Sequence, residues 1–197
     1  MRATTSIKRP RAAAWGESGF SLVETVVALA ILMIALLGMA ASIAHGLSMS
    51  KKLREMSDSK MTITSMLEQM ETLRNTKRLT FGQLANAGQV NNVGSTQDFN
   101  GFPVGFQPVS SSPGQDGIYG TADDLIDHGP DMQFGTADDF VNNALARPQY
   151  EREIVITSLG TNLKKVQVTM RFPGADGRQQ TLVGTSYLNN DANSNFR

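Results

Sequence analysis

The sequence GFSLVETVVALAILMIALLGMAASIA, residues 19–44, decides how the rest of the chain can fold. From Thr25 to Ala44 it contains twenty consecutive residues without a charged side chain. A helix rises about 1.5 Å per residue, so this run would be about 30 Å long, the thickness of the hydrocarbon core of a bilayer. A single carboxylate, Glu24, stands near its start. Because a carboxylate inside a bilayer costs about 2.5 to 3.5 kcal/mol, Glu24 is predicted to have a specific role.

The charges around the apolar run are unevenly distributed. Residues 1–19 contain four basic residues and one acidic residue, whereas the remaining residues contain 14 basic and 17 acidic ones. A basic flank before an apolar segment favours a cytoplasmic N-terminus, so we expect the rest of the chain to be exported. The mildly acidic exported part argues against general nucleic-acid binding. The chain has no cysteine, which excludes disulfides and zinc–thiolate sites.

Two ordinary kinds of N-terminal segment have to be weighed first. A secretory signal peptide has a shorter apolar region with a small-residue cleavage site after it. Here the run is long enough to span a membrane, and the conspicuous small residue, Gly19, precedes it. A permanent signal anchor fits the length of the run but gives no reason for Glu24.

The N-terminal junction resembles that of type IV prepilins and type II secretion pseudopilins. The resemblance rests on Gly19, the aromatic Phe20, the following SLV, Glu24 and the uninterrupted apolar run. It implies that a prepilin peptidase cleaves after Gly19 and methylates the new amino group of Phe20. Removal of the first 19 of 197 residues would leave a mature chain of 178 residues.

The resemblance also implies a role for Glu24. A subunit that packs into a filament has to neutralise its own amino terminus in apolar surroundings, and the Glu24 carboxylate of an adjoining subunit can pair with it. Such a buried pair is tolerable where either charge alone would be costly. Glu24 is therefore predicted to be an assembly residue. The segment ALLGMAA, residues 35–41, is similar to minor pilins of the PilV kind and to related pseudopilins.

The rest of the sequence predicts an α+β, pilin-like fold, in which a long N-terminal helix packs on a C-terminal antiparallel β-sheet. After a leader (1–19) and a transmembrane and assembly helix (20–45), an amphipathic helix is expected over 46–80. Residues 81–150 are expected to be irregular, with one or two short strands. Residues 151–188 alternate with a period of two and predict a three-stranded antiparallel meander, before a polar tail (189–197). The helical core positions are predicted to be Leu53, Met56, Ile63, Met66, Leu67, Met70 and Leu73.

Two acidic segments of the irregular region align without a gap, GQDGIYGTADDL (114–125) and GPDMQFGTADDF (129–140). Seven aspartates and no lysine or arginine lie between Asp116 and Asp139. Such crowding is unfavourable unless solvent or a cation relieves it, and carboxylates with backbone carbonyls are the ligands that calcium prefers. The alternative is a pair of solvated acidic turns, since Asp and Gly favour turns. The predicted calcium ligands are Asp116, Asp123 and Asp124 in the first segment and Asp131, Asp138 and Asp139 in the second.

These features predict a structural subunit and not an enzyme, because the two histidines, His45 and His128, do not suggest a catalytic triad. We expect a minor pilin that is anchored in the bacterial inner membrane, with its C-terminal domain in the periplasm, and that then enters a filament. The expected partners are a prepilin peptidase, other pilin or pseudopilin subunits, an inner-membrane assembly platform and membrane lipid, but no nucleic acid. Two alternatives stay open: a type II secretion pseudopilin, and an uncleaved membrane-anchored calcium-dependent binding module.

Overall fold

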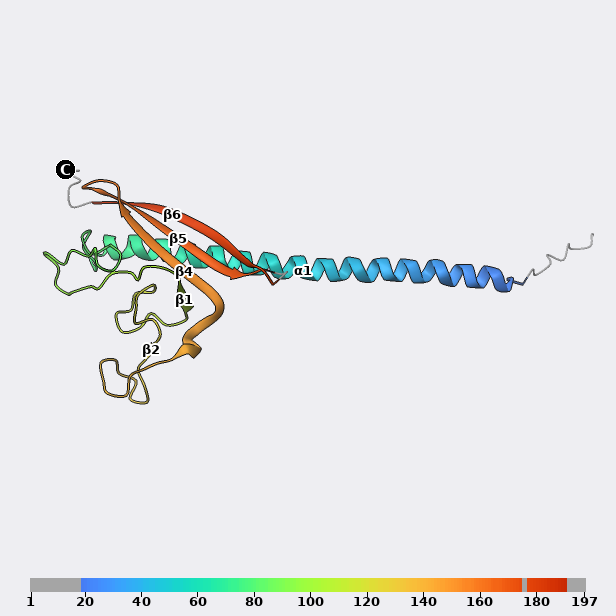
Figure 1. Ribbon diagram of the computed structural model, residues 1–197, viewed down its shortest axis with the longest axis horizontal. Helices are drawn as coiled ribbons and strands as arrows, with labels where there is room; N and C mark the ends of the chain where they lie inside the picture. The colour runs from blue at the N-terminus through green and yellow to red at the C-terminus, as the bar shows by residue number, and fades with distance from the viewer. Residues whose placement is uncertain (1–18, 175–176, 191–197) are drawn as a thin grey trace, which may run out of the picture. The chain divides into compact units, whose positions relative to one another are not determined.

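The computed structural model describes residues 19–174 and 177–190 of the chain. One long helix, α1 (Leu22–Asn75), is followed by a four-stranded antiparallel sheet, so the predicted α+β class is confirmed (Figure 1). The chain divides into two compact units, Met1–Gly46 and Leu47–Arg197, and each contains part of α1. The predicted leader, apart from Gly19, and most of the predicted polar tail lie outside the described residues.

The first unit consists, in its described part, of the apolar half of α1. Ser21 begins the helix as its N-cap, because its Oγ accepts a hydrogen bond from the backbone N–H of Glu24 at 3.2 Å. Among the described residues, α1 is the one helix that is long and apolar enough to cross a membrane. Every described residue up to Gly46 is exposed, so the apolar side chains of this segment are not used in the core.

In the second unit, α1 packs on the sheet through the side chains that the helical spacing predicts. Met70 is completely buried, and Ile63, Met66 and Leu73 are nearly so. The contact with β6 is close: a Cβ atom on Gly184 would lie 2.2 Å from the Cγ2 atom of Ile63, so this strand position requires glycine. All described buried residues lie between Ser59 and Leu188, so a fragment that begins at Leu47 contains the whole core.

Two of the predicted core positions on α1 are wrong. Leu53 is 56% exposed and Met56 is 42% exposed, because burial on this helix begins only at Ser59. The helix also ends earlier than the predicted boundary at residue 80. After Asn75, Lys77 adopts a left-handed conformation (φ 57°), and the N–H of Leu79 donates to the carbonyl of Leu73 at 3.2 Å.

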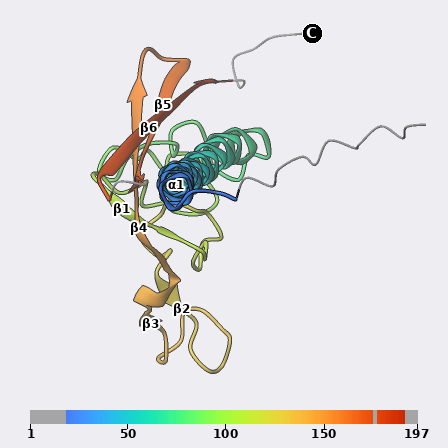
Figure 2. The same ribbon diagram turned by 90° about the vertical axis from the view of Figure 1, so that its right-hand side faces the viewer.

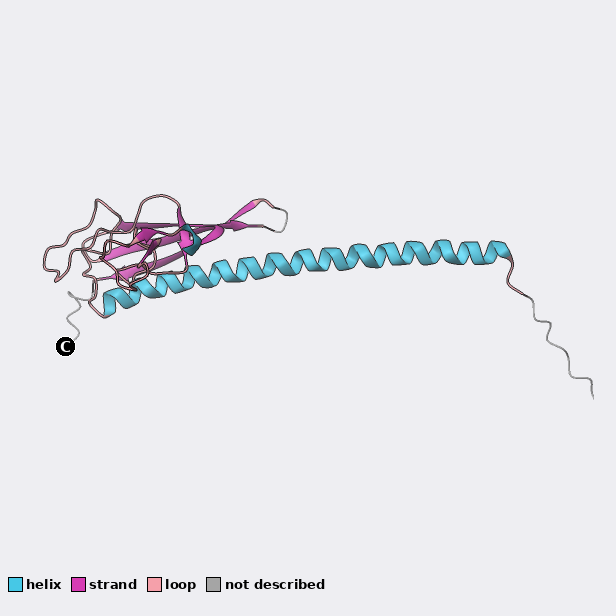
Figure 3. Cartoon of the chain, turned by 90° about the horizontal axis from the view of Figure 1, so that it is seen from below, coloured by secondary structure: helices cyan, strands magenta, loops and turns pink. Residues whose placement is uncertain are grey.

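The sheet follows the helix along its second half and has the strand order β1-β4-β5-β6 (Figure 3). The three-stranded meander is confirmed, and β1 extends it by pairing antiparallel with β4. The predicted inward row of β5, from Val166 to Phe172 in steps of two, is buried against α1 and the loops. The strands are β1 (Gln107–Ser110), β4 (Ala146–Ser158), β5 (Leu163–Pro173) and β6 (Gln179–Asn189).

The acidic segments lie between β1 and β4. The first runs into β2 (Ile126–Asp127), and the second forms the loop between β2 and β3 (Phe140–Val141). A short 3-10 helix, η1 (Asn143–Leu145), then leads into β4. Figure 2 shows β2, β3 and their loop set apart from the four-stranded sheet. The two repeats therefore occupy different environments within the same unit.

Candidate assembly site and acidic repeats

The predicted processing junction is open in the structure. Gly19 and Phe20 precede α1, and the Phe20 side chain is 79% exposed. A Cβ atom on Gly19 would meet no atom within 4 Å, so nothing in the described fold requires a glycine at this position. Accessibility of the peptide bond and freedom from packing constraints are both compatible with the cleavage that the resemblance implies.

Glu24 lies in the first turn of α1, where a negative charge is favourable near the positive end of the helix dipole. Its backbone N–H is bound by Ser21. Its carboxylate makes no hydrogen bond or ion pair with any described residue. The side chain is therefore available to a group outside this chain, and its role in assembly stays a prediction.

The two acidic repeats have the same local structure as well as the same sequence. In each repeat the three aspartates accept backbone N–H groups of their own loop, and the threonine hydroxyl donates to the second of them. In the first repeat, the N–H groups of Ile118, Asp116 and Gly120 donate to Asp116, Asp123 and Asp124 at 2.7, 2.9 and 2.9 Å, and the Thr121 hydroxyl donates to Asp123 at 2.7 Å. In the second repeat, the N–H groups of Gln133, Asp131 and Gly135 donate to Asp131, Asp138 and Asp139 at 2.8, 3.4 and 2.7 Å, and the Thr136 hydroxyl donates to Asp138 at 2.6 Å.

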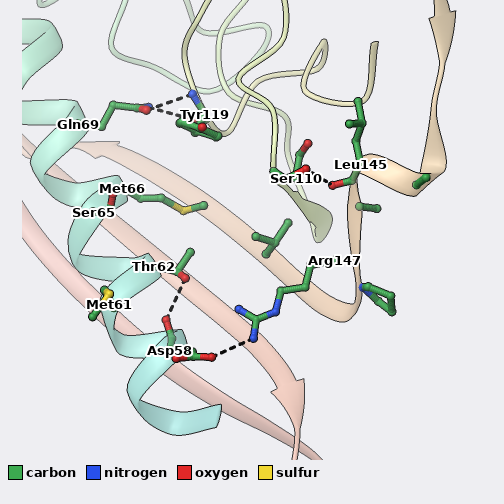
Figure 4. Close-up of a pocket in the computed structure, with 15 residues that line it drawn as sticks. Asp58, Met61, Thr62, Ser65, Met66, Gln69, Ser110, Tyr119, Leu145 and Arg147 are labelled. Carbon is green, nitrogen blue, oxygen red and sulfur yellow. Dashed lines mark hydrogen bonds and ion pairs between the residues drawn. The ribbon is translucent and has the colours of Figure 1, made fainter. Parts of the chain in front are cut away.

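The first repeat is docked into the protein. The guanidinium group of Arg152, on β4, forms an ion pair with the buried carboxylate of Asp124 and also donates to the carbonyl of Pro108 at 2.7 Å. The side chain of Gln69 on α1 binds both backbone groups of Tyr119, accepting from its N–H at 3.1 Å and donating to its carbonyl at 2.8 Å (Figure 4). The first repeat is thus held by the helix and by the sheet.

Sequence reasoning missed Arg152, although the pattern of β4 contains a signal for it. Tyr150, Ile154 and Ile156 are buried, and the period of two places Arg152 on the same inward face. An inward arginine needs an acidic partner, because an unpaired buried charge is very costly. The acidic region therefore has a basic neighbour, because Arg152, which lies outside it in the sequence, forms an ion pair with Asp124.

The second repeat has the same internal bonds but no comparable docking. Its last aspartate, Asp139, pairs with no basic residue among those described, and Gln133 is exposed where Ile118 is buried. Phe134 makes an edge contact with His128, with ring centroids 5.5 Å apart. The loop thus packs mainly on itself.

The carboxylates of the repeats also differ in their ionisation. Burial raises the pKa of Asp116 to about 6, and the nearby charge of Asp123 contributes to the increase, although the N–H of Ile118 opposes it. In the second repeat, a hydrogen bond from the hydroxyl of Thr136 lowers the pKa of Asp138, the residue that corresponds to Asp123 of the first repeat. The first repeat thus contains a carboxyl group with a raised pKa, Asp116, and the second contains one with a lowered pKa, Asp138.

Calcium binding stays a prediction for these residues. Among the residues described, no three Asp, Glu, His or Cys side chains lie close enough together to hold a metal ion. Asp98, Asp116 and Asp123 do line one small pocket of about 270 Å³, and Asn100 and Thr121 are also among its lining residues. An ion in this pocket would need backbone carbonyls, water or a rearrangement of side chains to complete its ligands.

The comparisons with known proteins bear on the N-terminal junction. Residues 16–40 match the family model described as the prokaryotic N-terminal methylation motif, and this match supports a type IV pilin-like protein. The motif implies processing by a prepilin peptidase and assembly with other pilin subunits, and with the apolar half of α1 it supports membrane anchoring. No curated protein and no solved structure matches the chain.

Proposed function

We propose that this protein is a minor structural subunit, of the PilV-like kind, of a type IV pilus-like filament. A prepilin peptidase cleaves it between Gly19 and Phe20 and methylates Phe20. The chain is inserted in the inner membrane with its N-terminus in the cytoplasm and the second unit in the periplasm, and an assembly platform then moves it into the filament. It has a structural role and no catalytic one.

The observation that carries this proposal is the methylation motif over residues 16–40, at the start of the helix half, up to Gly46, whose apolar side chains are all exposed. An exposed apolar helix of this length needs lipid before assembly and neighbouring helices after it. The α+β second unit, with its own core, then forms the part of the subunit outside the membrane. The Glu24 carboxylate, which lacks a partner in the described chain, is available to the amino terminus of a neighbour.

Two alternatives predict different behaviour. A type II secretion pseudopilin would be processed in the same way, but its loss would block secretion of folded proteins and leave surface pili intact. A permanently anchored calcium-dependent binding module would keep residues 1–19. The mass of the chain in the membrane separates this second alternative from both filament functions.

The test is the mass of the mature chain for the wild type and for Gly19→Val. We expect the wild type to lose residues 1–19 and gain one methyl group, and the variant to stay as the uncleaved precursor in the inner membrane. Because a side chain at position 19 meets no atom of the described fold, an uncleaved variant cannot be attributed to misfolding. Ser48→Val, beyond the junction on the exposed part of α1, is the control and should be processed normally. A wild-type mass for Gly19→Val would disprove the proposal.

A further inference from the structure

The second acidic repeat, residues 129–140, exposes groups that the first repeat uses for docking. In the first repeat, the last aspartate binds an arginine, and the backbone of the aromatic residue is bound by a helix side chain. The equivalent groups of the second repeat are the Asp139 carboxylate and the backbone of Phe134. Neither bonds to a residue outside the repeat within the described part of the chain. The first repeat therefore indicates what kind of surface the second one fits: one that offers a basic side chain to the last aspartate and a polar side chain to the loop backbone.

Apolar side chains on the second repeat strengthen this inference. Met132 is 79% exposed, and Phe140 and Val141 are more than half exposed. Met132 also holds a left-handed backbone (φ 58°) at the position where the first repeat has Gly117 (φ 63°). Residues 126–141 contain four aspartates and no lysine or arginine. The surface thus combines negative charge with exposed apolar side chains, a composition typical of a docking surface.

The chain itself carries a helical surface of complementary composition. Met49, Leu53 and Met56 recur at helical spacing on α1, and all three are exposed. Lys52 lies on the same face, and it forms no ion pair with any carboxylate of the described residues. We call this face the basic stripe (Met49, Lys52, Leu53, Met56 and Lys60), and all five of its side chains are exposed, including Lys60, although burial on α1 begins at Ser59. Two of its apolar positions, Leu53 and Met56, were predicted from the sequence to be core.

We propose that the second repeat of one subunit docks on the basic stripe of a second copy of this chain. The contact would cover Met132, Phe140 and Val141 of one copy with Leu53 and Met56 of the other. The carboxylates of Asp131 and Asp139 would face Lys52 and Lys60, as the carboxylate of Asp124 faces Arg152 within one chain. This inference rests on the proposed function, because a filament is what brings two copies side by side, and it requires at least one point in the filament where two copies are adjacent.

The test uses engineered cysteines in the full chain, which has no cysteine of its own. We expect a chain with Met132→Cys and Leu53→Cys to form, on mild oxidation in its native membranes, a disulfide dimer whose bond joins residue 132 of one copy to residue 53 of the other. A disulfide requires Cβ atoms about 3.5 to 4.5 Å apart, so it reports a direct contact. The matched control pairs Met132→Cys with Val93→Cys, which is equally open at 86% exposure. It should give no more dimer than either single cysteine.

A charge reversal tests the complementarity. In the cysteine pair background, Lys52→Glu should reduce the dimer about tenfold, because like charges then face each other across the contact. Lys165→Glu, which makes the same change on the outer face of the sheet, should leave the dimer unchanged. Both variants keep the repeat intact.

The inference is overturned if the 132–53 dimer is absent, if Val93→Cys gives as much of it, or if Met132→Cys links instead to a different protein. Cleavage at Gly19 is read from the same samples, so correct processing without the dimer would refute the docking and leave the proposed function standing.

Discussion

Asp124 and Asp139 are the same residue of a repeated motif, and their surroundings give them different energetic roles. Asp124 is buried and accepts from Gly120, Thr121 and Arg152. Asp139 accepts only from groups of its own loop. Removing one partner of a buried ion pair leaves the other charge desolvated, whereas a half-buried carboxylate outside the core keeps contact with water. The effect of a substitution at each site is therefore set by the position of the repeat and not by its sequence.

We expect Asp124→Asn to destabilise the fragment Leu47–Arg197 by about 3 to 5 kcal/mol, because the guanidinium group of Arg152 then lacks a charged partner in the core. Asp139→Asn is the matched control in the second repeat and should change the free energy of unfolding by about 0.5 kcal/mol or less. Urea denaturation at neutral pH measures both. Equal effects of the two substitutions would show that the Asp124–Arg152 pair does not hold the first repeat.

Asp116 should make the stability of the fragment depend on pH. Its pKa is raised from 3.8 to about 6 in the folded protein, so the folded state holds this proton more tightly than the unfolded state does. The proton on Asp116 therefore increases the free energy of unfolding as the pH falls from about 6 towards 4. This contribution is lost as the pH rises through about 6. We expect the difference in unfolding free energy between the wild type and Asp116→Asn to shift in favour of the wild type over this range. A difference that stays constant from pH 7 to pH 4 would contradict the raised pKa.

At the scale of the elements, the periodic parts of the fold could be predicted and the pairings that depend on distant residues could not. The alternation of β5 and the helical spacing from Ile63 to Leu73 report burial directly, since one residue in two or in three to four faces the core. β1 has no such pattern. Its four residues QPVS include a proline, which is tolerated because β1 lies at the edge of the sheet, and only the pairing with β4 defines it.

The same limit applies to the repeats. Their shared residues were predicted to be either calcium ligands or solvated acidic turns, and the hydrogen bonds common to both repeats involve only groups of their own loops. The sequence of the repeats could not show that Arg152 and Gln69 hold the first and leave the second exposed, because both partners come from other elements. Leu53 and Met56 illustrate the converse. Their spacing predicted a buried face, but both side chains are exposed, because the point on α1 at which burial begins is not encoded in the helix itself.

The calcium prediction concerns the whole loop from residue 114 to residue 140. If the ion binds, the fragment Leu47–Arg197 should melt at a higher temperature in calcium than in chelator. A site with a dissociation constant on the order of 0.1 to 1 mM would add about 1.4 kcal/mol at roughly tenfold excess of calcium. Magnesium should substitute poorly, because it loses its water ligands reluctantly.

Substitutions can locate the effect. Asp116→Asn and Asp123→Asn alter the carboxylates beside the small pocket and should abolish the response if the first repeat binds the ion, whereas Asp131→Asn and Asp138→Asn should abolish it if the second does. Titration calorimetry provides the direct measurement. If no heat of calcium binding is detected and chelator does not change the melting temperature, both repeats are solvated acidic turns.

At the scale of the whole molecule, the two units separate two tasks. The second unit contains every described buried residue and is stabilised by its own core. The described part of the first unit buries nothing within the chain, so its apolar residues can be satisfied only by lipid or by other subunits. Substitutions in the first unit should therefore affect insertion and assembly without changing the stability of the second unit.

Glu24 provides the sharpest test of that separation. We expect Glu24→Val and Glu24→Gln to insert in the membrane at least as well as the wild type, because a carboxylate in the bilayer is costly and both variants remove it. We also expect both to enter filaments at least about tenfold less, because the amino terminus of a neighbouring subunit would be buried without a counter-charge. The helix start should be unaffected, since Ser21 binds the backbone N–H of residue 24 and not its side chain.

Val26→Leu, two residues further along the same exposed segment, is the control for a change of apolar shape. The amount of each variant in sheared filaments, relative to its amount in the membrane, is the measurement. Incorporation of Glu24→Gln at the wild-type level would show that the charge of Glu24 is not required, and the assembly role would have to be assigned to another residue of the helix.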